Sequence, residues 1–260
     1  MVAALILDDG DRAVIHRVFG RRMPVRVCER VDVLRSMLAA ADVRLVITEL
    51  RDRVGASVIP LLADVGARAE SPMVVARVSL AGAAADDVMQ LAAARAPARV
   101  SLRGVASLGD ALTAALGGDR EPSADLVILE RIGPLVPRAV RAFLVLCAVA
   151  PSPRLHVGQA ATLLGMTPRT IESRLAQAAL PPAYRIIGWC VALHAAWQLD
   201  VLGQRPKQVA ANLGFQSAAA AANLLARYCH ASPSSLRVHG SFQVQLQRFA
   251  ALVQPNLRAE

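Results

Sequence analysis

The side chains that most often do chemistry in enzymes are scattered along this sequence. No nucleophile or carboxylate lies at a catalytic spacing from any of the histidines, His16, His156, His194, His230 and His239. The chain has no P-loop, no GxGxxG and no HExxH motif. Its four cysteines form no CxxC pair and no Cys/His set suited to zinc, so we expect buried, reduced thiols. The sequence therefore predicts a protein that is not an enzyme and that holds no metal or cofactor.

One stretch of the sequence occurs twice. Residues 159–175 read QAATLLGMTPRTIESRL, and 49 positions later residues 208–225 read QVAANLGFQSAAAAANLL. Each copy has a short apolar helix pattern, a glycine, and a second helix pattern whose apolar residues lie four positions apart. This order is typical of a helix-turn-helix motif, so the sequence predicts two such motifs and favours DNA as the partner.

Particular residues in each copy support the predicted turn. Gly165 and Gly214 can adopt the left-handed conformation that a short interhelical turn often needs. Thr167 and Ser217 lie where a side-chain hydroxyl caps the first turn of the second helix.

The positive charge of the chain is concentrated around the two copies. Residues 1–116 contain 15 Arg and 13 acidic residues, a net charge of +2, and residues 117–137 have a net charge of −2. Residues 138–260 contain 12 Arg or Lys and 3 acidic residues, so their net charge of +9 equals that of the whole chain. Such a segment favours a polyanionic partner. The alternative is that the arginines serve only to make the surface soluble.

The first part of the chain alternates short β-rich runs with amphipathic stretches. We predict strands at Ala3–Leu7, Val25–Cys28, Leu45–Thr48, Met73–Ala76 and Arg99–Leu102. We predict helices at Arg12–Phe19, Val31–Ala40, Val58–Val65, Ala83–Ala94 and Ser107–Leu116. This alternation predicts an α/β domain over residues 1–116, with a parallel sheet covered by helices on both faces.

The rest of the chain reads as an all-α domain. Gly, Pro and charged residues at 117–122 indicate a linker over residues 117–136, in which Asp125–Ile132 fits either a strand or a short helix. A helical domain with the two helix-turn-helix motifs follows at 137–240, and a helical tail at 241–260. The apolar run Ala142–Ala150 is far shorter than the roughly 20 residues that span a bilayer. The start of the chain lacks a basic lead-in, so we expect a cytoplasmic protein without a membrane partner.

Residues 137–237 resemble the DNA-binding domain of AraC/XylS regulators. The second motif carries most of the resemblance, because LGFQS at 213–217 and ARYCHASPSSLR at 226–237 match the family's Gly-Phe and its Ser-Pro-x-x-aromatic-Arg ending. Leu236 stands in place of the aromatic residue. The resemblance implies two helix-turn-helix motifs joined by a long helix, in a regulator that binds double-stranded DNA.

The long joining helix is predicted at Pro182–Leu202. At 1.5 Å per residue it extends roughly 30 Å, which can hold two recognition helices near one DNA turn, about 34 Å, apart. Gly188 costs this helix about 1 kcal/mol relative to Ala and allows a bend. Trp189 and Trp197 are expected to pack in the core rather than to stack on nucleic acid.

The resemblance implies which side chains contact DNA. In the first recognition helix, Arg169 suits guanine, Glu172 suits cytosine, and Arg174 suits a phosphate. The second recognition helix has five alanines at 218–222, which leaves Asn223 to read adenine. It either docks by shape and phosphate contacts or has become a packing or protein-binding surface, and we favour docking. The predicted DNA-binding residues are Thr167, Arg169, Thr170, Glu172, Ser173, Arg174, Lys207, Ser217, Asn223 and Arg227.

The layout of residues 1–116 resembles a response-regulator receiver domain. In such domains carboxylates after the first strand bind Mg²⁺, an Asp ends the third strand and is phosphorylated, a Ser or Thr ends the fourth, and a Lys ends the fifth. Here Asp8 and Asp9 follow the first strand, but Glu49, Arg77 and Arg103 occupy the other three positions.

These changes predict a pseudo-receiver that takes no phosphate. The Glu49 carboxylate is one methylene further out than that of Asp, and such misplacement costs orders of magnitude in rate. Arg77 or Arg103 is expected to neutralise Asp8, Asp9 or Glu49 in place of a metal ion. Alternatively, Asp8 and Asp9 only cap the helix that follows them.

The sequence as a whole predicts a two-domain transcriptional regulator that binds DNA through its second half. Its receiver-like half would then serve assembly, for example as a homodimer. One alternative is an interaction protein that pairs with a kinase or another regulator instead of DNA. Another is a small-ligand sensor with a pocket in the first domain. The target sequence and the choice between activation and repression stay open.

Overall fold

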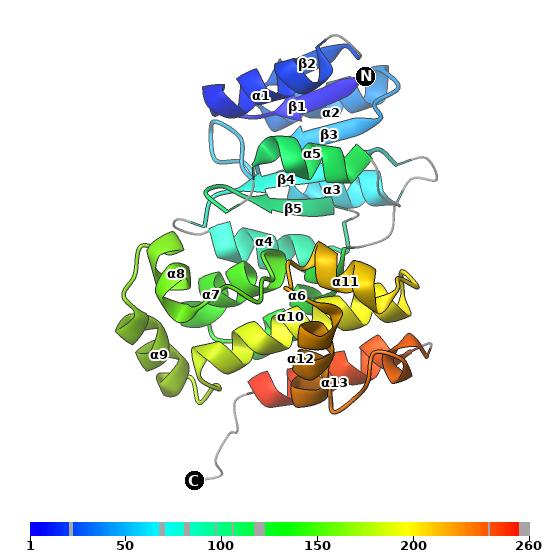
Figure 1. Ribbon diagram of the computed structural model, residues 1–260. Helices are drawn as coiled ribbons and strands as arrows, with labels where there is room; N and C mark the ends of the chain where they lie inside the picture. Colours follow the sequence, from blue (N-terminus) through cyan, green and yellow to red (C-terminus); the bar gives the residue numbers. More distant parts are fainter. Residues whose placement is uncertain are drawn as a thin grey trace. The chain divides into compact units, whose positions relative to one another are not determined.

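The chain forms two compact units, Met1–Val127 and Ile128–Glu260. The computed structural model describes residues 1–20, 23–67, 71–80, 84–96, 98–105, 107–116, 123–238 and 240–254. The first unit contains a five-stranded parallel sheet with helices, and the described part of the second is helical (Figure 1). We call them the α/β unit and the helical unit. The predicted combination of an α/β part and a helical part is confirmed.

Some predicted features fall where the structure is not described. These are residues 117–122 of the linker, residues 255–260 of the tail, Ala83 and His239. The rest of the predicted linker is mostly helical, with α6 (Ala124–Ile132) and the short 3-10 helix η1 (Gly133–Leu135). The stretch Asp125–Ile132, for which a strand and a helix were both considered, is therefore a helix.

The sheet is made of β1 (Val2–Leu5), β2 (Val25–Cys28), β3 (Leu45–Thr48), β4 (Met73–Val78) and β5 (Ala98–Leu102). Its order is β2-β1-β3-β4-β5, and all neighbouring strands are parallel. The five predicted strands match these within two residues at each end. The strand order is one of the two common orders of doubly wound sheets, which carry helices on both faces.

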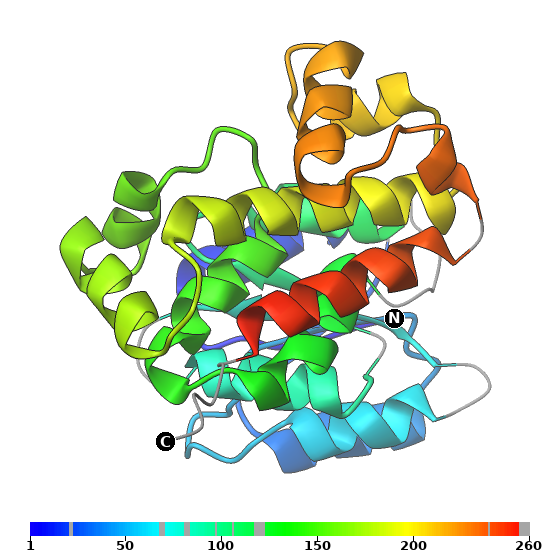
Figure 2. The ribbon, with the colours of Figure 1, turned by 90° about the horizontal axis from the view of Figure 1, so that it is seen from below.

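Helices cover the two faces of this sheet unequally. Helices α1 (Asp9–Phe19) and α5 (Leu108–Leu116) lie on one face, and α2 (Val31–Ala40), α3 (Ile59–Gly66) and α4 (Ala84–Ala93) lie on the other (Figures 1 and 2). Alternate strand residues such as Val2 and Ala4 pack with Ile15 and Phe19 of α1 in a fully buried core. The core follows from the strand period of two, which sends successive side chains to opposite faces.

The carboxyl ends of the parallel strands meet at one edge of the sheet. Asp8, Glu49 and Arg103 follow β1, β3 and β5, and Arg77 lies near the end of β4. The strand order reverses next to β1, and ligands of doubly wound sheets bind at the carboxyl edge beside such a reversal. The fold therefore brings the predicted receiver-pocket residues to the edge where a ligand site would lie.

The helical unit is organised around one long helix, α10 (Ala183–Asp200). The unit begins with the end of α6 and with η1. Its other described helices are α7 (Arg138–Val149), α8 (Val157–Leu163), α9 (Pro168–Gln177), α11 (Pro206–Asn212), α12 (Ala218–Cys229), α13 (Ser241–Val253) and the 3-10 helix η2 (Ser235–Arg237). Helices α7, α9, α11, α12 and α13 all pack against α10. Most residues of α10 are buried, as expected of a helix that is apolar on most of its sides.

Aromatic side chains tie α10 to its neighbours. Trp189 stacks on Phe249 of α13 with ring centroids 5.9 Å apart, and it meets Tyr228 of α12 edge-on at 6.0 Å. Trp197 contacts Phe242 edge-on at 4.9 Å, and Figure 2 shows α13 running beside α10. Trp189 is buried, as expected of a core residue, whereas Trp197 is only partly buried.

Gly188 marks a close approach between α10 and α12. A Cβ atom at this position would lie 2.1 Å from both Cζ and the hydroxyl oxygen of Tyr228. The 18-residue helix α10 is continuous through Gly188 and extends about 27 Å at 1.5 Å per residue. The glycine therefore serves to admit the tyrosine ring against the helix, a role that its position in the sequence did not reveal.

The cysteines have the character expected of core residues. All four are buried and none forms a disulfide. Burial raises the pKa of both Cys190 and Cys229 to about 12, which keeps these thiols protonated and unreactive. Separately, none of the helices in the described residues combines the length and hydrophobicity needed to cross a membrane.

Candidate functional site

Charged side chains form a hydrogen-bonded cluster at the carboxyl edge of the sheet. Asp11 Oδ2 accepts hydrogen bonds from Arg77 Nε at 3.2 Å and from Arg103 Nε at 2.9 Å. Arg103 also donates through Nη2 to Glu49 Oε1 at 2.8 Å, and Arg77 Nη1 donates to Ser101 Oγ at 2.8 Å. Asp11 is only 8% exposed, so its charge is balanced by the two guanidinium groups rather than by water.

The carboxylate at the centre of this cluster is not one of the predicted pair. Asp8 is exposed and caps α1, where its Oδ1 accepts a hydrogen bond from Asp11 N at 2.8 Å. That bond lowers the pKa of Asp8. The Asp9 side chain is 94% exposed and pairs with Arg12 at 3.4 Å. Asp8 therefore has the capping role considered as an alternative, and Asp11 replaces Asp8 and Asp9 as the partner of the arginines.

Glu49 is held on two sides. Its Oε1 accepts from Leu7 N as well as from Arg103, both at 2.8 Å. The pairing of Glu49 with Arg103 is as expected from the sequence. A phosphoryl group or a Mg²⁺ ion at this edge would have to compete with charge-assisted hydrogen bonds that already join Asp11 and Glu49 to arginines. Among the described residues, no group of three His, Cys, Asp or Glu side chains could hold a metal ion.

The two repeated stretches fold into helix pairs with the same turn. Helices α8 and α9 form the first pair, and α11 and α12 form the second. Gly165 and Gly214 have φ angles of 62° and 77°, in the left-handed region that favours glycine. Thr167 and Ser217 each cap the second helix by accepting a backbone hydrogen bond at 3.1 Å. The turn and cap predictions are confirmed at all four positions.

Backbone hydrogen bonds repeat as well. Met166 N donates to Ala161 O at 2.8 Å, and 49 positions later Phe215 N donates to Ala210 O at 2.8 Å. In each pair the donor follows the left-handed glycine and the acceptor carbonyl lies five positions before the donor. This hydrogen bond is typical of a helix that ends at a left-handed residue. The repetition noticed in the sequence is therefore a repetition of the folded backbone.

Helix α9 and its cap present several of the predicted residues to solvent. Arg169 and Ser173 are exposed, and the hydroxyls of Thr167 and Thr170 lie 2.8 Å apart at the start of the helix. Arg174 is partly buried, with Nη1 3.5 Å from the sulfur of Met166. This face combines one long cation with several hydroxyls, which suits contacts with base edges and phosphates.

Glu172 does not belong to this face. Both of its carboxylate oxygens lie 3.3 Å from Ala183 N, where the carboxylate caps the start of α10 and meets its dipole. Asp200 is used similarly, because it accepts hydrogen bonds from Gly240 N at 3.2 Å and Phe242 N at 2.8 Å at the start of α13. Glu172 is partly buried and its carboxylate has a partner within the fold, whereas base reading by this residue stays a prediction.

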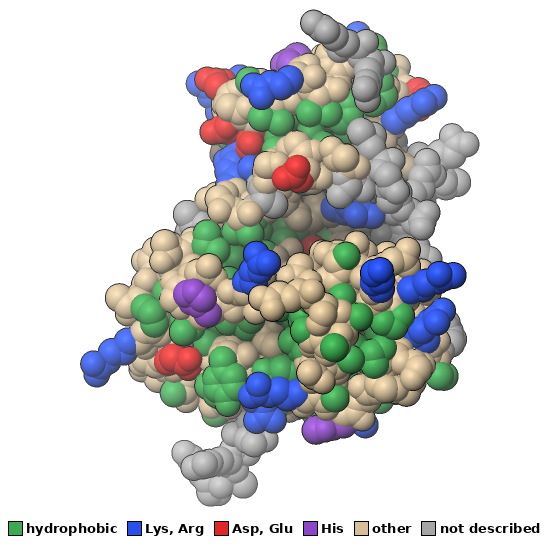
Figure 3. All heavy atoms as spheres, viewed as in Figure 1, with side chains coloured by type: hydrophobic (Ala, Val, Ile, Leu, Met, Phe, Trp, Pro, Cys, Tyr) green, Lys and Arg blue, Asp and Glu red, His purple; other side chains and the backbone are tan. Residues whose placement is uncertain are grey.

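These caps shape the electrostatics of the helical unit. Glu172 and Asp200 are the only acidic residues between positions 138 and 254, and both are bound to helix starts. On the face shown in Figure 3, most of the acidic side chains lie over the α/β unit, and Lys and Arg are the majority of the charged side chains over α8–α12. The positive charge of the helical unit is thus little compensated at its surface.

The second helix pair offers a different set. Asn223 and Arg227 are exposed one turn apart on α12, and Lys207 is exposed on α11. Arg227 Cζ lies 5.6 Å from the ring centroid of Tyr228, within the range of a cation–π contact. Small alanine side chains fill the rest of the exposed α12 surface, so two polar groups stand above a flat helix face.

The predicted residues thus form separate sets in the two units. Glu49, Arg77 and Arg103 meet at the sheet edge, and the predicted DNA-binding residues lie on α9, α11, α12 and their caps. Sequence reasoning missed Asp11, for which the only signal was a third acidic residue three positions after the cap at Asp8. Comparison with protein-family models, curated proteins and solved structures gives no match for this chain.

Proposed function

We propose that this protein is a cytoplasmic transcriptional regulator that binds double-stranded DNA with a helical domain of the AraC type. Its α/β unit would be a pseudo-receiver that takes no phosphate and serves assembly, for example as a homodimer. The observation that carries the proposal is the duplicated helix pair, in which turn glycines, capping hydroxyls and backbone hydrogen bonds recur on one continuous helix. In this proposal each pair is a helix-turn-helix motif, whose second helix enters the major groove.

The dimensions of α10 support this use of two pairs. Both pairs pack against α10, which is about 27 Å long. Successive major grooves on one side of DNA are about 34 Å apart. A rod of this length can carry two recognition helices into neighbouring grooves of one duplex, so a single chain would contact an asymmetric site.

The charge distribution supports a nucleic acid as the partner. Glu172 and Asp200 are engaged in capping, whereas Arg169 on α9 and Arg227 on α12 are exposed. In this proposal α9 reads bases through Arg169, while α12 docks through Arg227 and the neighbouring Lys207. Asn223 is the one side chain on α12 suited to read a base, because it can pair with adenine.

Replacing Arg169 by Ala tests the reading of bases. A bidentate contact between arginine and guanine contributes about 1–3 kcal/mol of discrimination, so the variant is expected to lose preference at one base pair while still binding DNA. The measurement is selection of bound sequences from a random duplex library, followed by salt titration of the selected duplex. For the wild type, the logarithm of the binding constant K should fall linearly with the logarithm of the salt concentration. The slope should be about −0.9 times the number of phosphates that the protein neutralises.

Arg237→Ala provides a matched control for this experiment. Arg237 is exposed and in the same unit but outside both helix pairs, so its loss should leave the selected sequence unchanged. Binding that shows neither salt dependence nor sequence preference would contradict the proposal. That result would favour the interaction protein, for which the alanine-rich surface of α12 is the supporting observation.

The strand order and the sheet-edge cluster support the pseudo-receiver. The order β2-β1-β3-β4-β5 is shared with flavodoxin-like domains, a group that includes receiver domains. Where a receiver holds its metal and its phosphate, Arg77 and Arg103 here bind Asp11 and Glu49. In this proposal the two arginines take the place of the metal ion, and Glu49 takes the place of the phosphorylated Asp.

Treatment with acetyl phosphate and Mg²⁺ is expected to leave this protein unlabelled. The only carboxylate at the phosphorylated position is Glu49, and it is already hydrogen-bonded to Arg103 and to Leu7 N. Mass spectrometry of the intact protein would detect an added phosphoryl group. Labelling of the wild type that disappears in Glu49→Gln would show that the site is active and that the proposal of a pseudo-receiver is wrong.

A further inference from the structure

A groove crosses the helical unit between its two helix pairs. It has a volume of about 510 Å³. One wall is the loop before α8 with the start of that helix, including Leu155 and His156, and the other wall is α12, including Asn223 and Arg227. The floor is a stripe of α10 that includes Tyr184 and Val191.

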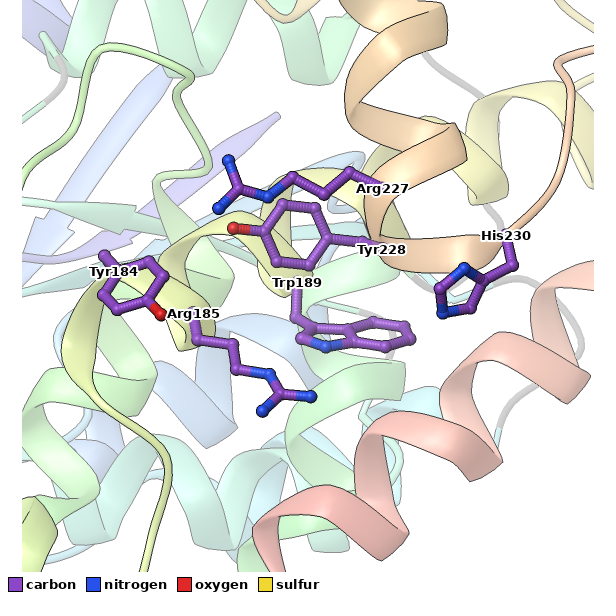
Figure 4. A pocket seen from close by; sticks show the side chains of 6 residues that line it. All are labelled: Tyr184, Arg185, Trp189, Arg227, Tyr228 and His230. Carbon is purple, nitrogen blue, oxygen red and sulfur yellow. The ribbon is translucent and has the colours of Figure 1, made fainter.

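A smaller cavity of about 170 Å³ extends the groove around Tyr228. Tyr184, Arg227 and Tyr228 line both spaces, and Arg185 and Trp189 are added in the smaller one. Figure 4 shows Arg227 and Tyr228 reaching from α12 toward Tyr184 and Arg185 at the start of α10. The two cavities share three lining residues, and we call the groove and the smaller cavity together the channel.

The rim of this channel is positive and open to solvent. Arg185 and Arg227 are both exposed, and neither forms an ion pair with a carboxylate of the described residues. Tyr184 is 59% exposed although it is a large aromatic side chain. Sites for small molecules usually bury 70–90% of the ligand surface. Side chains as exposed as these would bury a smaller fraction of a small ligand. The larger cavity is lined mainly by apolar residues, with Arg227 at its edge and Arg185 beside the smaller cavity. This combination favours an extended chain that has both uncharged and anionic groups.

We propose that this groove binds the sugar-phosphate backbone of the DNA strand that runs between the two recognition helices. Arg185 and Arg227 would each contact a phosphate, and the Tyr184 ring would pack against the sugar with its hydroxyl donating to a neighbouring oxygen. This inference rests on the proposed function, because two helix pairs that enter successive major grooves must be bridged by a stretch of duplex. One wall of the groove comes from each pair, so the bridging strand would lie across it.

The groove would account for how α12 contributes to binding with so few reading side chains. Phosphate contacts fix position and orientation without reading sequence. A backbone strand held between the pairs would set α12 in its major groove, while Arg169 on α9 supplies most of the base preference. Affinity and specificity would then reside in different parts of the helical unit.

The test uses the full-length protein, the duplex selected by the wild type, and the variants Arg185→Gln, Arg227→Gln and their combination. Each single variant is expected to lower affinity several-fold and to reduce the slope of log K against log salt by about 0.9, with unchanged base preferences. Arg237→Gln is the matched control, because it removes the same charge from the same unit but lines neither cavity. Its salt slope should stay that of the wild type.

Neutral DNA locates the contact. Test duplexes carry uncharged methylphosphonates in place of the phosphates between the two contacted major grooves. The wild type should bind these duplexes more weakly than it binds ordinary DNA. The double variant should bind both kinds of duplex with the same affinity. Groove variants that behave like Arg237→Gln, or that change base preference, would overturn the inference and leave the proposed function standing. A wild type that selects no duplex at all would overturn both.

Discussion

Replacing Arg77 and Arg103 together by glutamine is expected to destabilise the α/β unit by about 3–5 kcal/mol, because an ion left unpaired in the interior keeps its full desolvation cost. Asp11 is 8% exposed, and these two guanidinium groups are the cations that its carboxylate contacts in the described structure. Adding Asp11→Asn to the double variant removes the unpaired charge, so the triple variant should recover a large part of the loss.

Amide hydrogen exchange in the full-length protein measures this effect. Exchange of β1, β3 and β4 reports the opening free energy of the sheet without assuming that the two units unfold together. The matched control is Arg30→Gln with Arg53→Gln, which removes two arginines whose side chains are 61% and 71% exposed in surface ion pairs. Such pairs contribute about 0–1 kcal/mol each. Equal losses in the two double variants, or no recovery with Asp11→Asn, would contradict a buried, charge-balanced cluster.

Gly188→Ala is expected to destabilise the packing of α12 on α10, although alanine is the better helix former. The new Cβ would lie 2.1 Å from the end of the Tyr228 ring, and such overpacking costs about 1–3 kcal/mol. Against this, Ala in place of Gly favours the helix by about 1 kcal/mol. The displaced ring would also move out of its contact with Trp189 and into the groove, so binding of DNA should weaken as well.

The sign of the effect should reverse when the tyrosine is removed. In a Tyr228→Ala background the three atoms nearest to the new Cβ are gone, so Gly188→Ala should stabilise α10 by about 1 kcal/mol. Hydrogen exchange of α10 and α12 in the four proteins of this cycle gives the coupling, expected at about 1–3 kcal/mol. Additive effects of the two substitutions would show that the ring does not occupy the space beside Gly188.

Elements governed by local rules could be predicted from the sequence. The strands at residues 25–28 and 45–48 and the helix at residues 31–40 have the predicted bounds, because alternating and helical periodicities depend on residues near in sequence. The turns of the helix pairs are local for the same reason. Gly165 and Gly214 take the left-handed conformation, and Thr167 and Ser217 bond to amides three residues away.

Base reading by α9 and the loss of phosphotransfer stay predictions, since they depend on partners outside the chain. Within the chain, the positions that sequence reasoning missed or misplaced depend on contacts between distant elements. Asp11 meets Arg77 and Arg103 across 66 and 92 residues. The packing of α9 against α10 likewise brings the Glu172 carboxylate to Ala183 N at the start of α10. Tyr228 reaches Gly188 only because α12 packs on α10.

The residues by themselves determined where chain segments become strands, helices, turns and caps, since those choices are made by propensity and hydrogen bonds within a few positions. Only the tertiary structure decided which charged side chains meet, which acid is used as a cap, and where a groove opens between the helix pairs. The physical reason is that side chains on different elements interact over a few ångströms. Their identity as partners is therefore set by how whole elements dock and not by their spacing in the chain.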